Sequence, residues 1–152
     1  MPDLLGTLEI RSEVSQLEKV FAFVDQHCSR REIPDSIRYK VLLIAEELTM
    51  NAMSHGYRGR LDGWIAISLY RDDNGIEVRF EDEAPPFDPL HEGPEPRVDA
   101  GVAERPIGGL GIHLVKALSR MVKYERLGER NVVRVVFSTA TVPGDEAPAT
   151  LP

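Results

Sequence analysis

The chain has 152 residues, of which 42% are hydrophobic and 28% are charged, an ordinary composition for a globular protein. Its formal net charge of −7 disfavours direct binding to nucleic acid, because phosphate neutralisation needs a concentrated basic surface. With one cysteine, Cys28, and no apolar run near the roughly 20 residues of a membrane span, we expect a cytoplasmic protein without disulfides or a membrane anchor.

The chain opens with a strand-like pattern followed by a helical one. Residues 4–13 alternate loosely and predict a strand. Apolar residues at helical spacing then predict a helix over residues 12–31, with Ser12 as its N-cap. Ile33-Pro34 ends this helix, because the residue before a proline disfavours helical backbone.

A second helix and a hairpin are expected next. The helix should run over about residues 35–55, with Gly56 as its C-terminal stop. Residues 64–70 and 75–82 predict two strands. Asn74-Gly75 between them is a strong signal for a tight hairpin turn.

The second half of the chain begins with a long stretch without periodicity. Residues 84–107 hold six of the eleven prolines, and a loop of this length inside a compact domain is usually functional or disordered. Beyond it, a glycine-led helix is predicted over residues 108–122, and a hairpin over 122–127 and 132–140. The tail, residues 141–152, is rich in proline and small residues and is expected to be disordered.

The mixture of strands and helices lacks regular βαβ alternation, so we expect the α+β fold class. The predicted arrangement is a two-layer sandwich of a mixed, mainly antiparallel sheet with helices on one face. We see no internal repeat and expect a single domain over residues 1–140.

Polar groups interrupt the C-terminal part of the predicted second helix, in EELTMNAMSHGY, residues 46–57. At about 100° per residue, Glu47 and Asn51 share a face at the edge of the apolar stripe, whereas Glu46 points about 100° away. An amide oxygen can coordinate Mg²⁺, and a carboxylate one turn earlier can orient or deprotonate a hydroxyl that attacks a phosphoryl group. Taken alone, such a pair is more often the solvated face of an amphipathic helix.

Two further segments point to nucleotide chemistry, although each is weak alone. Gly108, Gly109 and Gly111 lie where the long loop enters a helix, and a helix N-terminus approached by glycine backbone favours phosphate. Asp82 lies at the exit of a predicted strand, where a carboxylate can accept a hydrogen bond from an exocyclic amine such as that of adenine. A flexible hinge and an ordinary acidic turn are the alternatives.

The order and spacing of these features resemble the GHKL ATPases, which include gyrase, heat-shock protein 90 and histidine kinases. Within that superfamily, E-E-L-x-x-N-A-x-x-H-G-Y, P-P-F-D-P and E-R-P-I-G-G-L-G-I-H-L-V are similar to the anti-sigma factor serine kinases of bacterial partner-switching modules. The resemblance covers roughly residues 5–139.

The resemblance implies a Bergerat-type ATP-binding fold in which Glu47 is the catalytic base and Asn51 is the Mg²⁺ ligand. Asp82 matches the aspartate that reads the adenine amine, and residues 85–107 match the ATP lid. His55 matches the family's helix end, where a structural role is expected. The residues implied to bind the nucleotide are Asn51, Asp82, Ala84, Arg105, Gly108, Gly109, Leu110 and Gly111.

Two departures from the family pattern bear on nucleotide affinity. The family usually has glycine two residues after the adenine-binding aspartate, where this chain has Ala84. One added methyl group there could tighten the pocket or demand different backbone angles. The last predicted hairpin also lacks the G-x-G-T that many members carry.

The implied function is a switch. Such a kinase binds Mg-ATP, phosphorylates a small anti-anti-sigma protein of the STAS type on Ser or Thr, and alternatively sequesters a sigma factor, commonly as a homodimer. One alternative is a kinase-inactive ATP-binding module that acts by binding alone. A histidine kinase catalytic domain is disfavoured, because the residues before the catalytic helix leave no room for a dimerisation helix pair.

Overall fold

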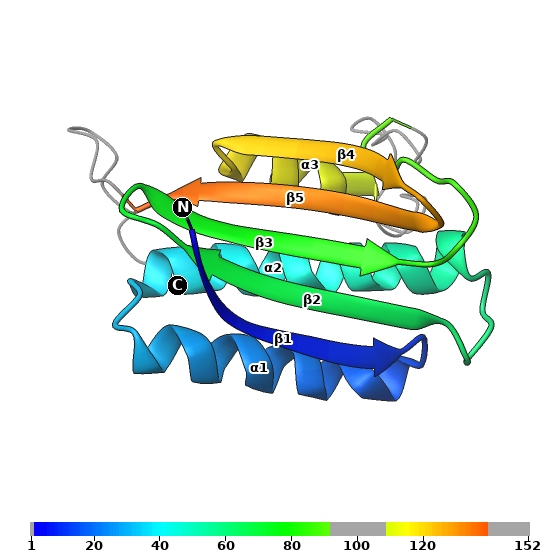
Figure 1. Ribbon diagram of the computed structural model, residues 1–152, viewed down its shortest axis with the longest axis horizontal. Helices are drawn as coiled ribbons and strands as arrows, with labels where there is room; N and C mark the ends of the chain where they lie inside the picture. Colours follow the sequence, from blue (N-terminus) through cyan, green and yellow to red (C-terminus); the bar gives the residue numbers. More distant parts are fainter. Residues whose placement is uncertain (1, 92–108, 140–152) are drawn as a thin grey trace, which may run out of the picture.

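The computed structural model of the chain describes residues 2–91 and 109–139 (Figure 1). It has two layers, a five-stranded sheet and a layer of helices that covers one face of that sheet (Figure 1). This arrangement confirms the expected α+β class. The elements are β1 (Asp3–Arg11), the short 3-10 turn η1 (Val14–Gln16), α1 (Leu17–Arg30), α2 (Asp35–Asn51), the π-helix η2 (Ala52–Gly56), β2 (Trp64–Arg71), β3 (Gly75–Asp82), α3 (Gly109–Leu118), β4 (Met121–Leu127) and β5 (Arg130–Ser138).

The strand order is β1-β2-β3-β5-β4. The expected mainly antiparallel sheet is found, and all four pairings among the described strands are antiparallel. The last hairpin, β4–β5, is placed so that β5 pairs with β3. This order brings the start of β5 beside the exit of β3, where Asn131 stands opposite Asp82.

The β2–β3 turn shows why the hairpin predicted from Asn74-Gly75 forms. The Asp72 carboxylate accepts hydrogen bonds from the backbone N–H groups of Asn74 and Gly75, both at 2.8 Å. A Cβ at Gly75 would lie 2.1 Å from the carbonyl oxygen of Phe137. Glycine is therefore required there by the close approach of β5.

The core lies between the sheet and the helices. Alternate residues of β2, including Ile65, Ile67 and Leu69, point toward the helices and are fully buried. Val41 and Ile44 of α2 are equally buried against them. Burying each such side chain contributes about 1.5–3 kcal/mol, so this interface fixes the position of α2 on the sheet.

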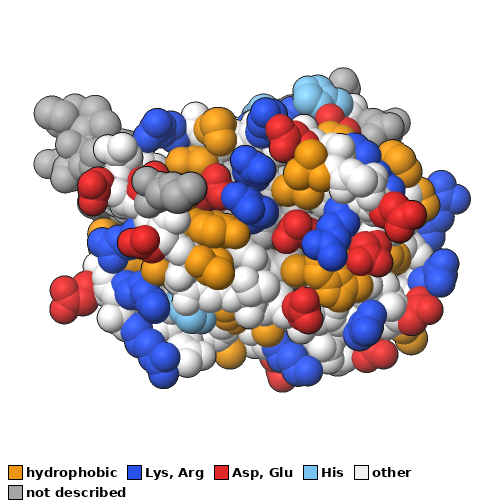
Figure 2. Space-filling view, viewed as in Figure 1, with side chains coloured by type: hydrophobic (Ala, Val, Ile, Leu, Met, Phe, Trp, Pro, Cys, Tyr) orange, Lys and Arg blue, Asp and Glu red, His pale blue; other side chains and the backbone are white. Residues whose placement is uncertain are grey.

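The other face of the sheet carries no helix among the described residues (Figure 1). Figure 2 shows this face, on which acidic and basic side chains are interspersed with apolar ones. Ion pairs such as Arg79–Glu77, 3.1 Å apart, lie along the strands there. The two signs of charge offset one another over this surface.

The prediction that Ser12 caps the first helix is wrong. Ser12 is buried, and its hydroxyl donates to the carbonyl oxygen of Arg60 and accepts from the N–H of Gly63 at 2.8 Å. The chain leaves β1 through the turn η1, and α1 begins only at Leu17. Ser12 therefore ties the end of β1 to the segment before β2.

Other boundaries also differ from the sequence-based expectation. The α-helical part of the second helix ends at Asn51, and η2 continues it to the predicted stop at Gly56. The third helix ends at Leu118 instead of residue 122, because β4 begins at Met121. Residues 92–107 of the expected lid and the tail 141–152 lie outside the described residues. Among the helices that the structure describes, none is both long and apolar enough to cross a membrane.

Candidate functional site

A pocket lies between the C-terminal end of α2, the exit of β3 and the start of β5. It encloses roughly 350 Å³, part of which is open to solvent. Its walls combine apolar side chains with a few polar groups, the usual composition of a small-molecule site. The lining residues are Leu48, Asn51, Ala52, Gly56, Phe80, Asp82, Phe87, Pro89, Asn131 and Val133.

The wall from α2 is shaped by the π-helix η2. The N–H of Tyr57 donates to the carbonyl oxygen of Ala52 at 2.7 Å, five residues earlier. Such π segments are rare and frequently occur at functional sites. Gly56 then passes so close to the exit of β3 that an added Cβ would lie 3.1 Å from the Cβ of Ala84. Two small residues therefore let the helix end close the pocket.

Asn51 and Glu47 occupy different positions relative to this pocket. Asn51 lines it and is only 7% exposed. Glu47, one turn earlier on α2, is half-buried and is not part of the pocket lining. Its Oε2 is buried and has no hydrogen-bond partner among the described residues. Burial, and then the nearby carboxylate of Glu46, raise the pKa of Glu47 above its usual range.

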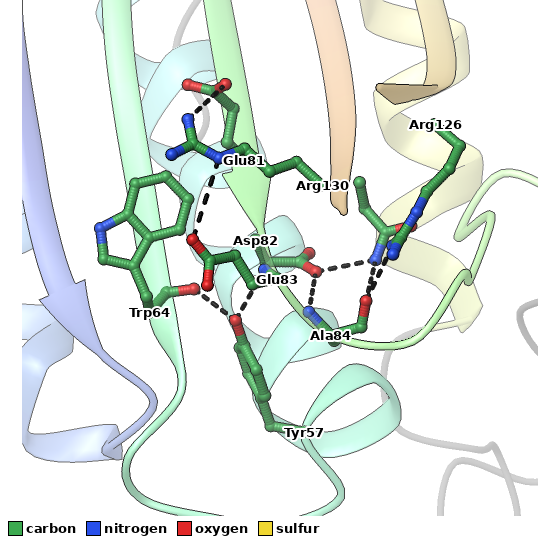
Figure 3. A network of polar contacts seen from close by, with 9 residues as sticks. Tyr57, Trp64, Glu81, Asp82, Glu83, Ala84, Arg126 and Arg130 are labelled. Carbon is green, nitrogen blue, oxygen red and sulfur yellow. Dashed lines mark hydrogen bonds and ion pairs between the residues drawn. The ribbon is translucent and has the colours of Figure 1, made fainter. Parts of the chain in front are cut away.

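Asp82 ends β3 and lines the pocket, and Figure 3 shows its carboxylate beside the backbone of Ala84. Its Oδ1 accepts hydrogen bonds from the side-chain Nδ2 of Asn131 at 2.8 Å and from the N–H of Ala84 at 3.0 Å. Burial raises the pKa of Asp82, and these two donors and the guanidinium of Arg126 only partly oppose that rise. The carboxylate is thus a desolvated acceptor held by its neighbours.

A network around Tyr57 fixes the strand ends on the other side of Asp82 (Figure 3). The Tyr57 hydroxyl donates to the carbonyl oxygen of Trp64 at 2.5 Å and accepts from the N–H of Glu83 at 2.8 Å. The Arg130 guanidinium lies 4.5 Å from the Trp64 ring centroid, and its nitrogens lie 3.7 Å from Glu81 Oε1 and 3.9 Å from Glu83 Oε1. The Tyr57 contacts join the residue after η2 to β2 and to the exit of β3, and the Arg130 contacts join β5 to the same two strands.

The comparison with known protein families matches residues 10–137 to the histidine kinase-like ATPase domain. The chain belongs to this family. The match runs from the end of β1 to the end of β5 and so includes every wall of the pocket. The GHKL superfamily and an ATP-binding, kinase-like ATPase are thereby confirmed. A search of curated proteins found no match.

The lining of this pocket carries the types of polar group that a nucleotide with Mg²⁺ would need. Asp82 offers a carboxylate and Asn51 an amide oxygen, and both residues line the pocket. Among the described residues, no group of three His, Cys, Asp or Glu side chains could hold a metal ion by itself. An amide ligand suits Mg²⁺ nonetheless, because this ion usually keeps several waters and takes oxygens from phosphate groups.

The structure places Gly109 and Gly111, two of the three glycines expected to approach phosphate, in the first turn of α3. Gly109 begins that helix, which includes Leu110 and Gly111, whereas Arg105 and Gly108 lie outside the described residues. The helix contacts α2. Lys116 of α3 donates to the carbonyl oxygen of Leu90 at 2.6 Å, which ties the helix to the described start of the expected lid.

Ala84 does not line the pocket. Its side chain is buried against Gly56, and its backbone N–H and carbonyl groups contact Asp82 and Arg126. Among the described residues, positive φ is confined to two non-glycine positions elsewhere and two glycines, so Ala84 has ordinary backbone. The methyl group that replaces the family's hydrogen atom therefore demands no left-handed conformation.

Sequence reasoning missed several residues of the pocket wall, among them Phe87 and Asn131. Phe87, in the P-P-F-D-P motif, stacks on the exposed His55 ring with centroids 5.7 Å apart and 20° between planes. Asn131 follows the β4–β5 turn and is 3% exposed. A buried polar residue after a hairpin turn is a signal, but its partner Asp82 is set by strand pairing far along the chain.

Proposed function

We propose that this chain is a protein serine/threonine kinase that uses Mg-ATP, phosphorylates a small STAS-type anti-anti-sigma protein and alternatively sequesters a sigma factor. The family match supports the ATP-binding part. The serine kinase part is supported by the motifs E-E-L-x-x-N-A-x-x-H-G-Y and P-P-F-D-P, which resemble the anti-sigma factor kinases. The proposed partners are that antagonist, a sigma factor and a second copy of the chain.

The observation that carries the kinase proposal is the buried, unpartnered oxygen of Glu47, one turn before Asn51 on α2. A carboxylate with a free acceptor atom and a raised pKa suits a general base, because its proton affinity lies closer to neutral pH. A structural carboxylate in the same place would be expected to have a hydrogen-bond partner.

The residues divide the work as follows. When bound, Mg-ATP supplies the transferable phosphoryl group and a cation that neutralises charge at the phosphates. Asp82 holds the adenine ring by accepting a hydrogen bond from its exocyclic amine. Asn51 provides an oxygen ligand for the cation. Glu47 orients the hydroxyl of the antagonist and takes its proton. Phosphorylation then adds charge at the interface with the antagonist, which releases it.

The proposal is tested by transfer of labelled γ-phosphate from ATP to a STAS-type antagonist. Glu47→Gln keeps the size of the side chain and removes the base, so labelling should fall at least about a hundredfold. Glu46→Gln is the matched control, because it makes the same substitution at the exposed neighbouring residue. This variant should retain phosphoryl transfer. Asn51→Ala should lose Mg²⁺-dependent labelling.

Two outcomes would contradict the kinase. Equal labelling by Glu47→Gln and Glu46→Gln would remove Glu47 from the mechanism. Nucleotide binding without any labelling would favour a binding module that acts without transfer, a reading that the position of Glu47 outside the pocket lining also supports. The proposed homodimer fails if light scattering gives the monomer mass, 17.0 kDa, at working concentration.

A further inference from the structure

The side-chain amide of Asn131 forms hydrogen bonds through both its nitrogen and its oxygen. Its Nδ2 donates to Asp82 Oδ1 at 2.8 Å, to the carbonyl oxygen of Pro85 at 3.1 Å and to that of Ala84 at 3.2 Å. Because the NH2 group has two hydrogens, the three acceptors share them. Asn131 therefore holds both the Asp82 carboxylate and the backbone that follows it.

The opposite end of the amide fixes its orientation. Asn131 Oδ1 accepts from the Tyr124 hydroxyl at 2.6 Å and from the N–H of Phe87 at 3.3 Å. Rotating the amide by 180° would point the oxygen at three acceptors and the NH2 group at two donors. The surrounding hydrogen bonds thus determine which end faces Asp82.

This arrangement makes the two oxygens of Asp82 inequivalent. Oδ1 receives both Asn131 Nδ2 and the N–H of Ala84. Oδ2 has no hydrogen-bond partner among the described residues, and it is not among their buried, unpartnered atoms. Since Asp82 and Asn131 both line the pocket, Oδ2 is the oxygen left for a ligand.

We propose that Asn131 is a positioning residue that fixes Asp82 so that one acceptor, Oδ2, selects a 6-amino purine over a 6-oxo purine. The inference rests on the proposed nucleotide site. A 6-amino group donates to Oδ2, whereas a 6-oxo group would place a second acceptor against it. The preference for one purine over the other then depends on Asn131 of β5 as well as on the Asp82 carboxylate that it orients.

The test compares dissociation constants for ATP and inosine triphosphate, which has a 6-oxo base, by calorimetry on the full chain. Wild type should prefer ATP. Asn131→Leu keeps a similar volume but lets the Asp82 carboxylate turn, so the ratio of the two constants should fall about tenfold, the effect of one hydrogen bond. Tyr124→Phe is the comparison variant: it removes one of the two bonds at the other end of the amide, while the N–H of Phe87 and the bond from Nδ2 to Asp82 remain, so the ratio should fall much less than in Asn131→Leu.

A second variant keeps the proposal testable if Asn131→Leu does not fold. In Asp82→Asn, the two donors at Oδ1 should hold the oxygen of the new amide there and turn its NH2 group toward the base. The preference should then shift toward inosine triphosphate. In the double variant Asp82→Asn/Asn131→Leu, the amide can turn, and this shift should be smaller.

The outcomes separate the inference from the proposed function. If wild type binds ATP but Asn131→Leu keeps the wild-type ratio, or Asp82→Asn shows no shift toward inosine triphosphate, Asn131 does not orient Asp82 and the proposal is wrong. The nucleotide site would stand in that case. If wild type binds neither nucleotide, both the site and the inference are overturned.

Discussion

Two carboxylates near the pocket, Glu47 on α2 and Asp82 on β3, are held in different ways. Burial raises the pKa of both. Asp82 has one oxygen fixed by two donors, whereas Glu47 has a buried oxygen without a hydrogen-bond partner in the described residues. A carboxylate that reads a ligand needs a fixed direction, and a carboxylate that takes a proton needs a free acceptor. The difference therefore matches the two proposed roles.

The largest effect should appear in the pH dependence of phosphoryl transfer. Glu47 must be deprotonated to act as a base, so transfer should fall about tenfold per pH unit below its raised pKa. That acid limb should lie above pH 4.5, the ordinary value for a glutamate. Glu46→Gln removes one of the two causes of the shift and should move the limb to lower pH. A limb unchanged in Glu46→Gln would mean that the charge on Glu46 does not affect the reacting group.

An intermediate effect concerns the cost of the charge on Asp82. Its pKa is raised above 3.8, so the folded protein binds the proton more tightly than the unfolded chain does. The free energy of unfolding should therefore fall as pH rises from the ordinary pKa of an aspartate to the raised pKa of Asp82. At neutral pH the carboxylate is charged, and the whole loss of stability is present. We expect Asp82→Asn to be more stable than wild type in urea unfolding at pH 7. The gain should shrink as pH falls toward 3.8, and a gain that does not depend on pH would contradict this explanation.

The smallest effect should come from restoring the family's glycine. Ala84→Gly loses a buried methyl group and gains unfolded-state entropy, so unfolding should cost about 1 kcal/mol less. ATP affinity should stay within about twofold, because the Ala84 side chain lies outside the pocket and its N–H group remains. A large gain in affinity, measured by calorimetry, would show that the methyl group restricts the site.

Local signals in the sequence predicted most of the fold. The β2–β3 hairpin was predictable because Asp72, Asn74 and Gly75 form the turn by contacts within four residues. Helical periodicity also placed Glu47 and Asn51 on neighbouring positions of α2. It did not show that, of these two residues, Asn51 lines the pocket and Glu47 does not. That difference depends on how the helix packs against β3 and β5.

The errors and omissions involve partners far along the chain. Ser12 has the residue type and position of a helix cap, but Arg60 and Gly63 bind its hydroxyl instead. The role of Asn131 depends on the pairing of β3 with β5, which brings it opposite Asp82 across 49 positions. No local pattern predicts such a pairing. The π-helix likewise has no signature that the sequence alone reveals.

That π-helix has a consequence for how the site tolerates change in chain length. A π turn closes a hydrogen bond over five residues where an α-helix uses four, so η2 is equivalent to an α-helix that carries one inserted residue. If all five residues from Ala52 to Gly56 wound as a regular α-helix, the extra residue would turn everything after it by about 100°. Tyr57 would then leave Trp64 and Glu83, and the wall of the pocket would move with it. At this position the number of residues matters as much as their identity.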